Sequence, residues 1–221
     1  MEAVLKIGGS LAENPDRLIR LCKELSGLAK VHKIVVVPGG GEFADKVREL
    51  DKRIELSNRT AHQMAVLAVD QYGLLLSDIT PNSSVVSKIE KLNISIEGKL
   101  QVFLPSQYIF CEDPLENSWD VTSDAIAAHI AGRINAKKLI LATNVDGIFS
   151  ENPKQNTNAK LIEEMSAEQL LSWNKRTSVD ITLPKIILQT GLECYVVNGK
   201  YPERIEKILK NKETICTHIT H

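Results

Sequence analysis

A lysine followed by two glycines and a serine closes the first apolar run of the chain, AVLKIGGS at residues 3–10. Glycine lets backbone N–H groups approach a ligand closely, and a helix after such a loop adds unpaired N–H donors and a positive dipole end. An ammonium on Lys6 would add a full positive charge. The pattern favours a phosphate-binding turn at Gly8, Gly9 and Ser10, and the alternative is an edge-strand lysine that points to water.

A second glycine cluster, Gly39–Gly40–Gly41, follows the apolar run IVVV. It also leads into a segment of helical period, so it stands in the same place as the first cluster. Two clusters at corresponding strand ends favour phosphate binding over ordinary turn glycines. Neither cluster fits the Walker or dinucleotide pattern, and the protein-kinase motifs are missing from the sequence.

A second lysine, Lys185, stands in the apolar stretch DITLPKIILQTG, and two acids, Asp120 and Asp124, stand four residues apart in SWDVTSDAIAAHIA. An acid between Lys6 and Lys185 would hold both ammonium groups in place and keep them charged. The alternatives are a solvated lysine on an outer helix face and two acids that only compensate a helix dipole.

The composition describes an ordinary globular chain of 221 residues with 43% hydrophobic and 25% charged residues and a net charge of −1. Such a charge gives no global attraction to nucleic acid or membrane. The four cysteines form no CxxC pair, which argues against a disulfide framework and a zinc site. No signal peptide or membrane-spanning run is visible, so we expect a cytoplasmic protein.

Strand-like and helix-like segments alternate along the chain. Apolar runs near residues 3–9, 33–41, 99–105, 137–147, 193–199 and 213–220 predict strands. Helical spacing predicts helices near 14–30, 41–55, 59–78, 122–136, 165–174, 181–191 and 201–211. The alternation predicts an α/β fold whose largely parallel sheet is covered on both faces and binds ligands beyond the carboxyl ends of its strands.

Four blocks in this order resemble the amino acid kinase superfamily: LKIGGS, VVVPGGGEFAD, WDVTSDAIAAHIAGRINAKKLILATNVDGIFSENP and DITLPKIILQTG. The resemblance implies a three-layer αβα sandwich with a mainly parallel central sheet, formed by one domain over 1–221. The part up to about 135 would bind a phosphoryl acceptor, and the part from about 136 would bind ATP. Mg²⁺ would enter with ATP rather than occupy a protein site, and the chain would form a homo-oligomer.

The resemblance also implies roles for single residues. Lys6 and Lys185 would be catalytic lysines organised by Asp124. The phosphoryl group would be held by Gly8, Gly9 and Ser10, and the acceptor by Gly39, Gly40 and Gly41. The ATP site would include Thr143, Asp146, Gly147, Phe149, Asn152 and Lys154, with Asn152 where the family often has aspartate.

Within the superfamily the short length and the segments AHQMAVLAVDQYGLLLSD and SWDVTSDAIA most resemble an archaeal and methylotroph branch. That branch adds a second phosphate to (aminomethyl)furan-methanol phosphate in methanofuran biosynthesis. The residues agree with such an acceptor, because the GGG loop suits an anion while Glu42, Asp45 and Asp120 could face an ammonium. Asp78 could add to them, and the alternative is that Glu42 and Asp45 only stabilise the dipole of the following helix.

Other acceptors and roles stay open. Isopentenyl phosphate kinase is similar but carries a histidine soon after its GGG loop, where this chain has EFAD. Uridylate kinase would show a basic residue there, and none precedes Lys46. An acetylglutamate kinase-like enzyme and a non-catalytic nucleotide-binding scaffold are further alternatives. His62 and His129 lie on apolar helical segments and are expected to be packed or surface residues.

Overall fold

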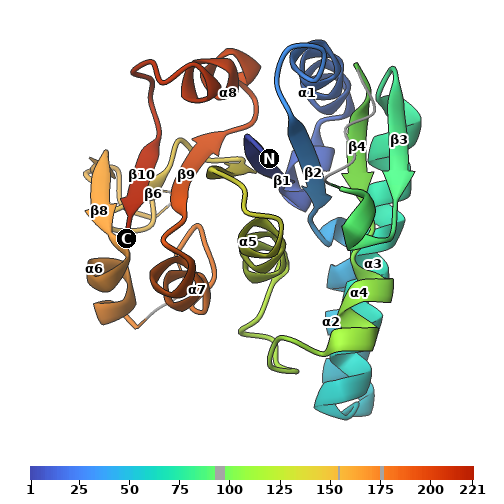
Figure 1. The fold of residues 1–221 in the computed structure, drawn as a ribbon. Coiled ribbons are helices and arrows are strands. Elements are labelled where there is room, and N and C mark those ends of the chain that lie inside the picture. The colour runs from blue at the N-terminus through green and yellow to red at the C-terminus, as the bar shows by residue number, and fades with distance from the viewer. Residues whose placement is uncertain (93–97, 154, 175–176) are drawn as a thin grey trace.

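The computed structural model describes residues 1–92, 98–153, 155–174 and 177–221, and an eight-stranded sheet organises them (Figure 1). The strands are β1 Ala3–Ile7, β2 Ile34–Pro38, β3 Ser83–Val86, β4 Leu100–Phe103, β5 Lys138–Thr143, β8 Glu164–Ser166, β9 Glu193–Asn198 and β10 Thr217–Thr220. They follow the order β3–β4–β2–β1–β5–β9–β10–β8. β10 runs antiparallel to β9, and the other neighbours are parallel.

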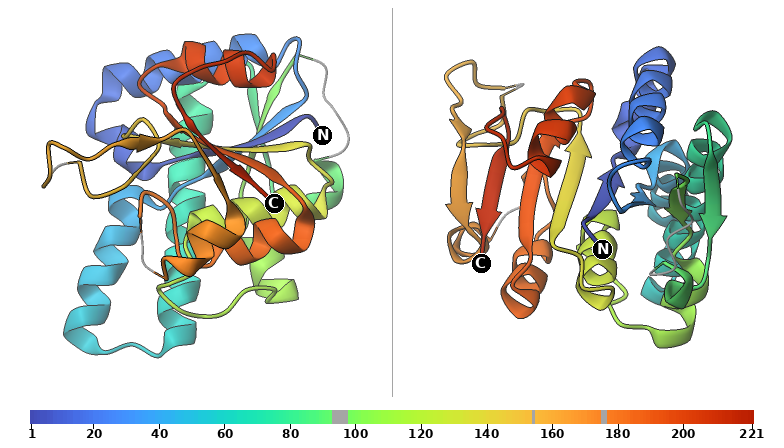
Figure 2. Two further views of the ribbon diagram at one scale, coloured as in Figure 1. Left: turned by 90° about the vertical axis from the view of Figure 1, so that its left-hand side faces the viewer. Right: turned by 45° about the horizontal axis from the view of Figure 1, so that its top comes forward.

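The helices cover both faces of the sheet. Their bounds are α1 Pro15–Leu28, α2 Gly41–Ile54, α3 Asn58–Ile79, α4 Ser106–Glu112, α5 Ser123–Arg133, α6 Ala167–Ser172, α7 Leu183–Thr190 and α8 Pro202–Leu209. α1 and α8 lie on one face and α5 and α7 on the other, and α2 and α3 form a pair that projects away from the sheet (Figures 1 and 2). This layered α/β arrangement confirms the predicted fold class.

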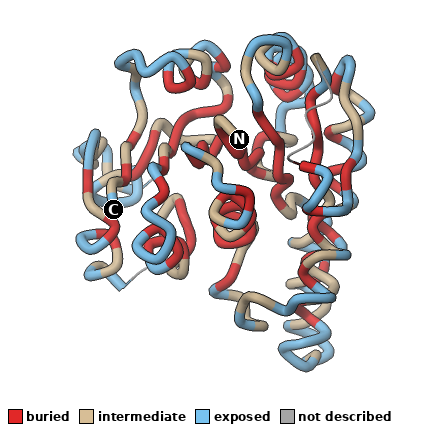
Figure 3. The backbone as a smooth tube through the Cα atoms, in the orientation of Figure 1, coloured by how far each residue is buried: buried red, intermediate tan, exposed pale blue. Residues whose placement is uncertain are grey.

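The central position of β1 settles why a lysine stands inside an apolar run. β1 pairs with β2 on one side and with β5 on the other, so it is no edge strand. Its side chains alternate between two cores: Leu5 and Ile7 pack with α1 and α8, and Val4 packs with α5. Lys6 shares the face of Val4 and therefore points toward α5. Figure 3 shows the buried strands at the centre of the molecule.

The glycine clusters after β1 and β2 press against each other. A Cβ atom on Gly9 would collide with the backbone of Gly41, and one on Gly39 would lie 2.7 Å from the Gly9 nitrogen. Gly41 also has a positive φ of 55°, which favours glycine. These glycines therefore have a packing role, because side chains would force the two loops apart.

Local signals explain where two helices begin. Asn14 accepts a hydrogen bond from the Arg17 backbone N–H at 3.0 Å, and Pro15 occupies the first turn of α1. Thr122 rather than Ser123 is the N-cap of α5 and accepts a hydrogen bond from the Asp124 N–H at 3.2 Å. These hydrogen bonds stabilise the N-terminal ends of α1 and α5.

The sequence patterns missed several short elements: β3, α4, β8 and the separate hairpin of β6 (Ile148–Phe149) with β7 (Leu161–Ile162). Their segments are too short to show a clear period of 2 or 3.6. No helix in the described part of the chain combines the length and apolar character needed to cross a membrane.

Candidate functional site

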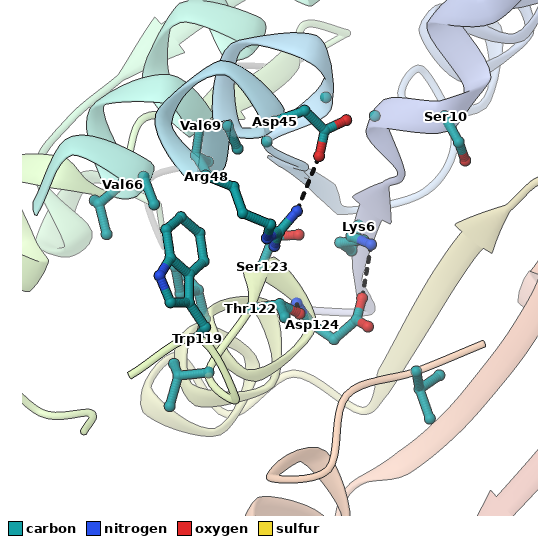
Figure 4. Close-up of a pocket in the computed structure, with 18 of the residues that line it drawn as sticks. Lys6, Ser10, Asp45, Arg48, Val66, Val69, Trp119, Thr122, Ser123 and Asp124 are labelled. Atoms are coloured by element: carbon teal, nitrogen blue, oxygen red, sulfur yellow. Dashed lines mark hydrogen bonds and ion pairs between the residues drawn. The ribbon is translucent and has the colours of Figure 1, made fainter. Parts of the chain in front are cut away.

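A buried ion pair marks the carboxyl end of β1. Lys6 Nζ lies 2.7 Å from Asp124 Oδ1, and the two residues are 8% and 5% exposed. Asp124 comes from the first turn of α5, whose N-terminus meets the end of β1 (Figure 4). Removing one partner of such a pair would leave a buried charge unpaired, so each residue holds the other in place.

A second buried carboxylate, Asp180, ties the N-termini of α5 and α7 together. One of its oxygens accepts hydrogen bonds from Thr122 N at 3.0 Å and Ala125 N at 3.0 Å, and the other accepts from Leu183 N at 2.7 Å. Its own N–H donates to Asp124 Oδ2 at 3.2 Å. Burial, together with the negative charge of Asp124, raises the pKa of Asp180. No role was predicted for this residue, whose hydrogen bonds from Thr182 N and Leu183 N form an Asx-type turn before α7.

A cavity of about 290 Å³ opens between α2, α3 and the start of α5, and we call it the helix-walled cavity. Each of the two long helices presents one stripe of residues to it, spaced by three and four positions as on a single helix face. The stripes are Gly41, Ala44, Asp45 and Arg48 on α2, and His62, Ala65, Val66 and Val69 on α3. Lys6 and Asp124 lie together at its inner end (Figure 4), and Gly9 also lines it.

An aromatic side chain is fixed in the wall of this cavity. Trp119 Nε1 donates a hydrogen bond to Asp51 Oδ2 at 2.7 Å. The Arg48 guanidinium lies 4.6 Å from the centre of a Trp119 ring and pairs with Asp45 Oδ1 at 2.9 Å (Figure 4). The helix-walled cavity therefore contains a cation, a carboxylate and an aromatic face in one cluster.

A second cavity of about 460 Å³, the loop-walled cavity, lies beyond the ends of β1 and β5. It is lined by Gly8 and by the segment after β5, including Thr143, Gly147, Phe149 and Asn152. The two cavities share five residues, Lys6, Gly9, Ser10, Thr177 and Ser178. They therefore meet at the lysine and the first glycine loop.

Several predicted site residues lie elsewhere. Glu42 and Asp120 are exposed and line neither cavity, so only Asp45 of the three proposed acceptor-site acids faces the helix-walled cavity. Glu42 is one position from the cavity stripe of α2, which turns it about 100° away. Gly39 also lines neither cavity, because it packs behind the first loop and donates its N–H to the Ile7 carbonyl at 2.8 Å.

Two further predicted site residues, Asp146 and Lys185, line neither cavity. Asp146 does not line the loop-walled cavity; it pairs with Arg204 NH1 at 2.6 Å and accepts from Asn198 Nδ2 at 3.0 Å. Lys185 is exposed on the first turn of α7 and lines neither cavity. Asp124 forms its ion pair with Lys6, and its role between Lys6 and Lys185 stays a prediction. Lys154 lies outside the described residues.

Three further residues of the helix-walled cavity, Arg48, Trp119 and His62, were not assigned to a site from the sequence. Arg48 places a basic residue in this cavity, so the lack of a basic residue before Lys46 does not argue against a uridylate acceptor. His62 is buried, as expected for a packed residue, but it also faces the cavity. The signal that could have found Arg48 and His62 is the helical spacing from Gly41 and from Val66 and Val69.

The donor set bears on how a metal ion could be held. Within the described ranges, no three His, Cys, Asp or Glu side chains gather as a metal site. Mg²⁺ commonly takes one or two carboxylates together with substrate phosphates, and Asp124, which pairs with Lys6 in the helix-walled cavity, is the carboxylate nearest to this chemistry. The residues present thus suit an ion that is held mainly by a bound nucleotide, and this arrangement stays a prediction.

Comparisons with known proteins agree with the motifs. The model of the amino acid kinase family matches residues 1–198. The "[5-(aminomethyl)furan-3-yl]methyl phosphate kinase" of Methanocaldococcus jannaschii is 35% identical over 218 residues, which cover 98% of this chain and 96% of that protein. The "Uridylate kinase" of Archaeoglobus fulgidus is 28% identical and covers 96% of this chain and 97% of its own length. The crystal structure of uridylate kinase from that organism superposes with a TM-score of 0.79 at 27% identity over 100% of both chains.

Proposed function

Because the chain belongs to the amino acid kinase family, we propose that it phosphorylates [5-(aminomethyl)furan-3-yl]methyl phosphate to the diphosphate. The family match and the kinase relatives indicate that the chain is an ATP-dependent phosphotransferase, whichever acceptor it uses. The observation that carries the finer proposal is the 35% identity to the phosphate kinase of Methanocaldococcus jannaschii over 98% of this chain.

We assign the helix-walled cavity to the acceptor and the loop-walled cavity to ATP. The former, at about 290 Å³, carries the lysine, the glycine loops and the side-chain stripes of α2 and α3. The latter is larger, at about 460 Å³, and is lined mainly by the loop after β5. This assignment follows the expected division near residue 135, although the same sheet continues through both parts.

Lys6 stands where the two substrates would meet. In the proposed reaction an oxygen of the acceptor phosphate attacks the γ-phosphorus of ATP, the bond from that phosphorus to the bridging oxygen breaks, and ADP leaves. The acceptor phosphate is already ionised near neutral pH, so the reaction requires no general base. Catalysis then consists of positioning and charge stabilisation, which the fixed ammonium of Lys6 and N–H groups of the glycine loops other than Gly8 and Gly39 would supply. The Gly8 and Gly39 N–H groups already donate to the carbonyls of Ala142 and Ile7.

Asp124 and Asp180 are positioning residues in this proposal. Asp124 fixes the Lys6 ammonium at 2.7 Å, and Asp180 fixes the helix end that carries Asp124. Lys185 remains the proposed second catalytic lysine, on a helix whose N-terminus Asp180 also holds. Mg²⁺ bound with ATP would neutralise charge on the nucleotide phosphates.

Uridylate is the second candidate acceptor, because the uridylate kinase of Archaeoglobus fulgidus matches in both sequence and structure. The test is to measure kcat/KM for the aminated furan phosphate, isopentenyl phosphate and UMP at matched ATP and Mg²⁺, with ³¹P NMR to identify the diphosphate. We expect at least a tenfold preference for the aminated acceptor, about 1.4 kcal/mol. A preference for UMP or for isopentenyl phosphate would contradict the proposal and leave the kinase assignment intact.

A further inference from the structure

His62 is a buried polar residue in the wall of the helix-walled cavity that the proposed transfer step does not use. It is 7% exposed, and its Nε2 atom is buried without a hydrogen-bond partner among the described residues. Buried side-chain nitrogens are nearly always hydrogen bonded, so this atom calls for a partner. Nε2 itself has less than 1 Å² of accessible surface, so a bound acceptor supplies that partner once the imidazole rotates toward the cavity that the residue lines.

The position of His62 along α3 places it away from phosphoryl transfer. Val69 lines the same cavity seven residues later, which corresponds to about 10 Å along a helix axis. On α2, Arg48 is likewise seven residues, or about 10 Å, beyond Gly41, which contacts the first glycine loop. His62 and Arg48 therefore belong to the outer end of the cavity, opposite the end that holds Lys6.

We propose that His62 binds the protonated amine of the acceptor, with Nε2 accepting an N–H hydrogen bond at this outer end. The inference rests on the proposed function and deepens it, because it assigns a residue to the end of the acceptor that does not react. It makes His62 a specificity-determining residue rather than a catalytic one.

Charge and protonation at the outer end agree with an amine. Burial lowers the pKa of His62, against a smaller opposite effect of Asp113, so the neutral imidazole with a free acceptor nitrogen is favoured. Asp45 contributes a carboxylate that the Arg48 guanidinium at the same end pairs with at 2.9 Å, and Asp113 adds a second negative charge that acts on His62, so the carboxylates outnumber the cation. The phosphate of the acceptor belongs at the opposite end, with Lys6 and the glycine loops.

The test compares the aminated furan phosphate with an analogue in which a methyl group replaces the aminomethyl group. The variants are His62→Leu, His62→Gln and the matched control Gln63→Leu, whose residue is adjacent on α3 but does not line the cavity. His62→Leu should raise KM about tenfold for the aminated acceptor, with KM for the methyl analogue and for ATP unchanged. His62→Gln should retain part of the preference, because its amide oxygen also accepts hydrogen bonds.

Several outcomes would overturn the inference. His62→Leu could change KM for both acceptors equally or for neither, or Gln63→Leu could have the same effect as His62→Leu. A wild-type enzyme that uses both furan phosphates equally well would also contradict it while leaving the kinase reaction intact. No turnover of either furan phosphate by the wild type would instead defeat the proposed function, and the inference with it. If His62→Leu does not fold, the comparison of His62→Gln with the wild type carries the test.

Discussion

The two cavities that meet at Lys6 are built in different ways. The helix-walled cavity takes its side chains from one stripe of α2 and one of α3, so each position is fixed by a helix several turns long. The loop-walled cavity takes most of its lining from the segment after β5, where short turns position each residue separately. A cavity built on helix faces suits selection among small acceptors, whereas a loop can wrap a nucleotide that many related enzymes share.

The largest expected effect is at the junction, which belongs to both cavities. Lys6→Met removes the charge aimed at the transferring group, so kcat should fall by roughly 100-fold or more, about 2.7 kcal/mol. It also leaves Asp124 buried and unpaired, which should lower the free energy of unfolding by about 3 kcal/mol. Steady-state kinetics and urea denaturation measure the two effects.

Lys185→Ala is the informative control for Lys6→Met. As the proposed second catalytic lysine it should also lose roughly 100-fold in kcat. Because Lys185 is exposed, its free energy of unfolding should stay within about 0.5 kcal/mol of the wild type. Wild-type turnover in either variant would remove that lysine from the mechanism.

Replacing Asp180 tests whether this one residue stabilises the N-terminal ends of both α5 and α7. Asp180→Ala removes the acceptor oxygens that hold the starts of α5 and α7, so the free energy of unfolding should fall by roughly 2 kcal/mol, about one per helix end. Asp120→Ala, in the exposed loop before α5, should change it by less than about 0.5 kcal/mol. Equal unfolding midpoints for the two variants would show that Asp180 does not support the helix ends.

Arg48 tests the acceptor side alone. Arg48→Ala removes the guanidinium that pairs with Asp45 and lies over Trp119, so both side chains lose a partner that orients them in the cavity wall, and KM for the acceptor should rise about tenfold with KM for ATP unchanged. Lys46→Ala is the matched control, because Lys46 lies on α2 but pairs with Glu49 on the exposed side. A rise in KM for ATP in the Arg48 variant would break the assignment of the two cavities.

Arg204 tests the nucleotide side and should give the smallest effect. Its ion pair with Asp146 holds the loop after β5 against α8 without lining the loop-walled cavity. Arg204→Ala should therefore raise KM for ATP only about threefold and leave KM for the acceptor unchanged. Lys207→Ala, an exposed residue of the same helix, is the control and should change neither constant.

The difference between a cavity lined by helix faces and one lined by a loop also explains how much of the site the sequence could predict. The strand that carries Lys6 and the alternation of the longer strands and helices follow from local periods, and the structure confirms them. The spacing of three and four residues from Gly41 to Arg48 also predicts which side chains of α2 face the cavity. That spacing leaves Glu42 out of the cavity lining.

The remaining site features depend on tertiary contacts. Asp180 reaches α5 from 55 residues away in the sequence, and Trp119 is fixed by Asp51 from 68 residues away. The ion pair of Asp146 with Arg204 likewise spans 58 residues. No local pattern encodes such partners, because they are brought together only when the sheet has formed.

The most direct test of the cavity assignment uses Trp119, the tryptophan that lines the helix-walled cavity. The chain has two tryptophans, so Trp173→Phe leaves Trp119 as the only indole reporter. We predict that the aminated furan phosphate changes the Trp119 fluorescence at concentrations near its KM, because it binds beside that ring. A non-hydrolysable ATP analogue alone should leave the emission unchanged. A response to the ATP analogue and none to the acceptor would contradict the assignment and exchange the roles of the two cavities.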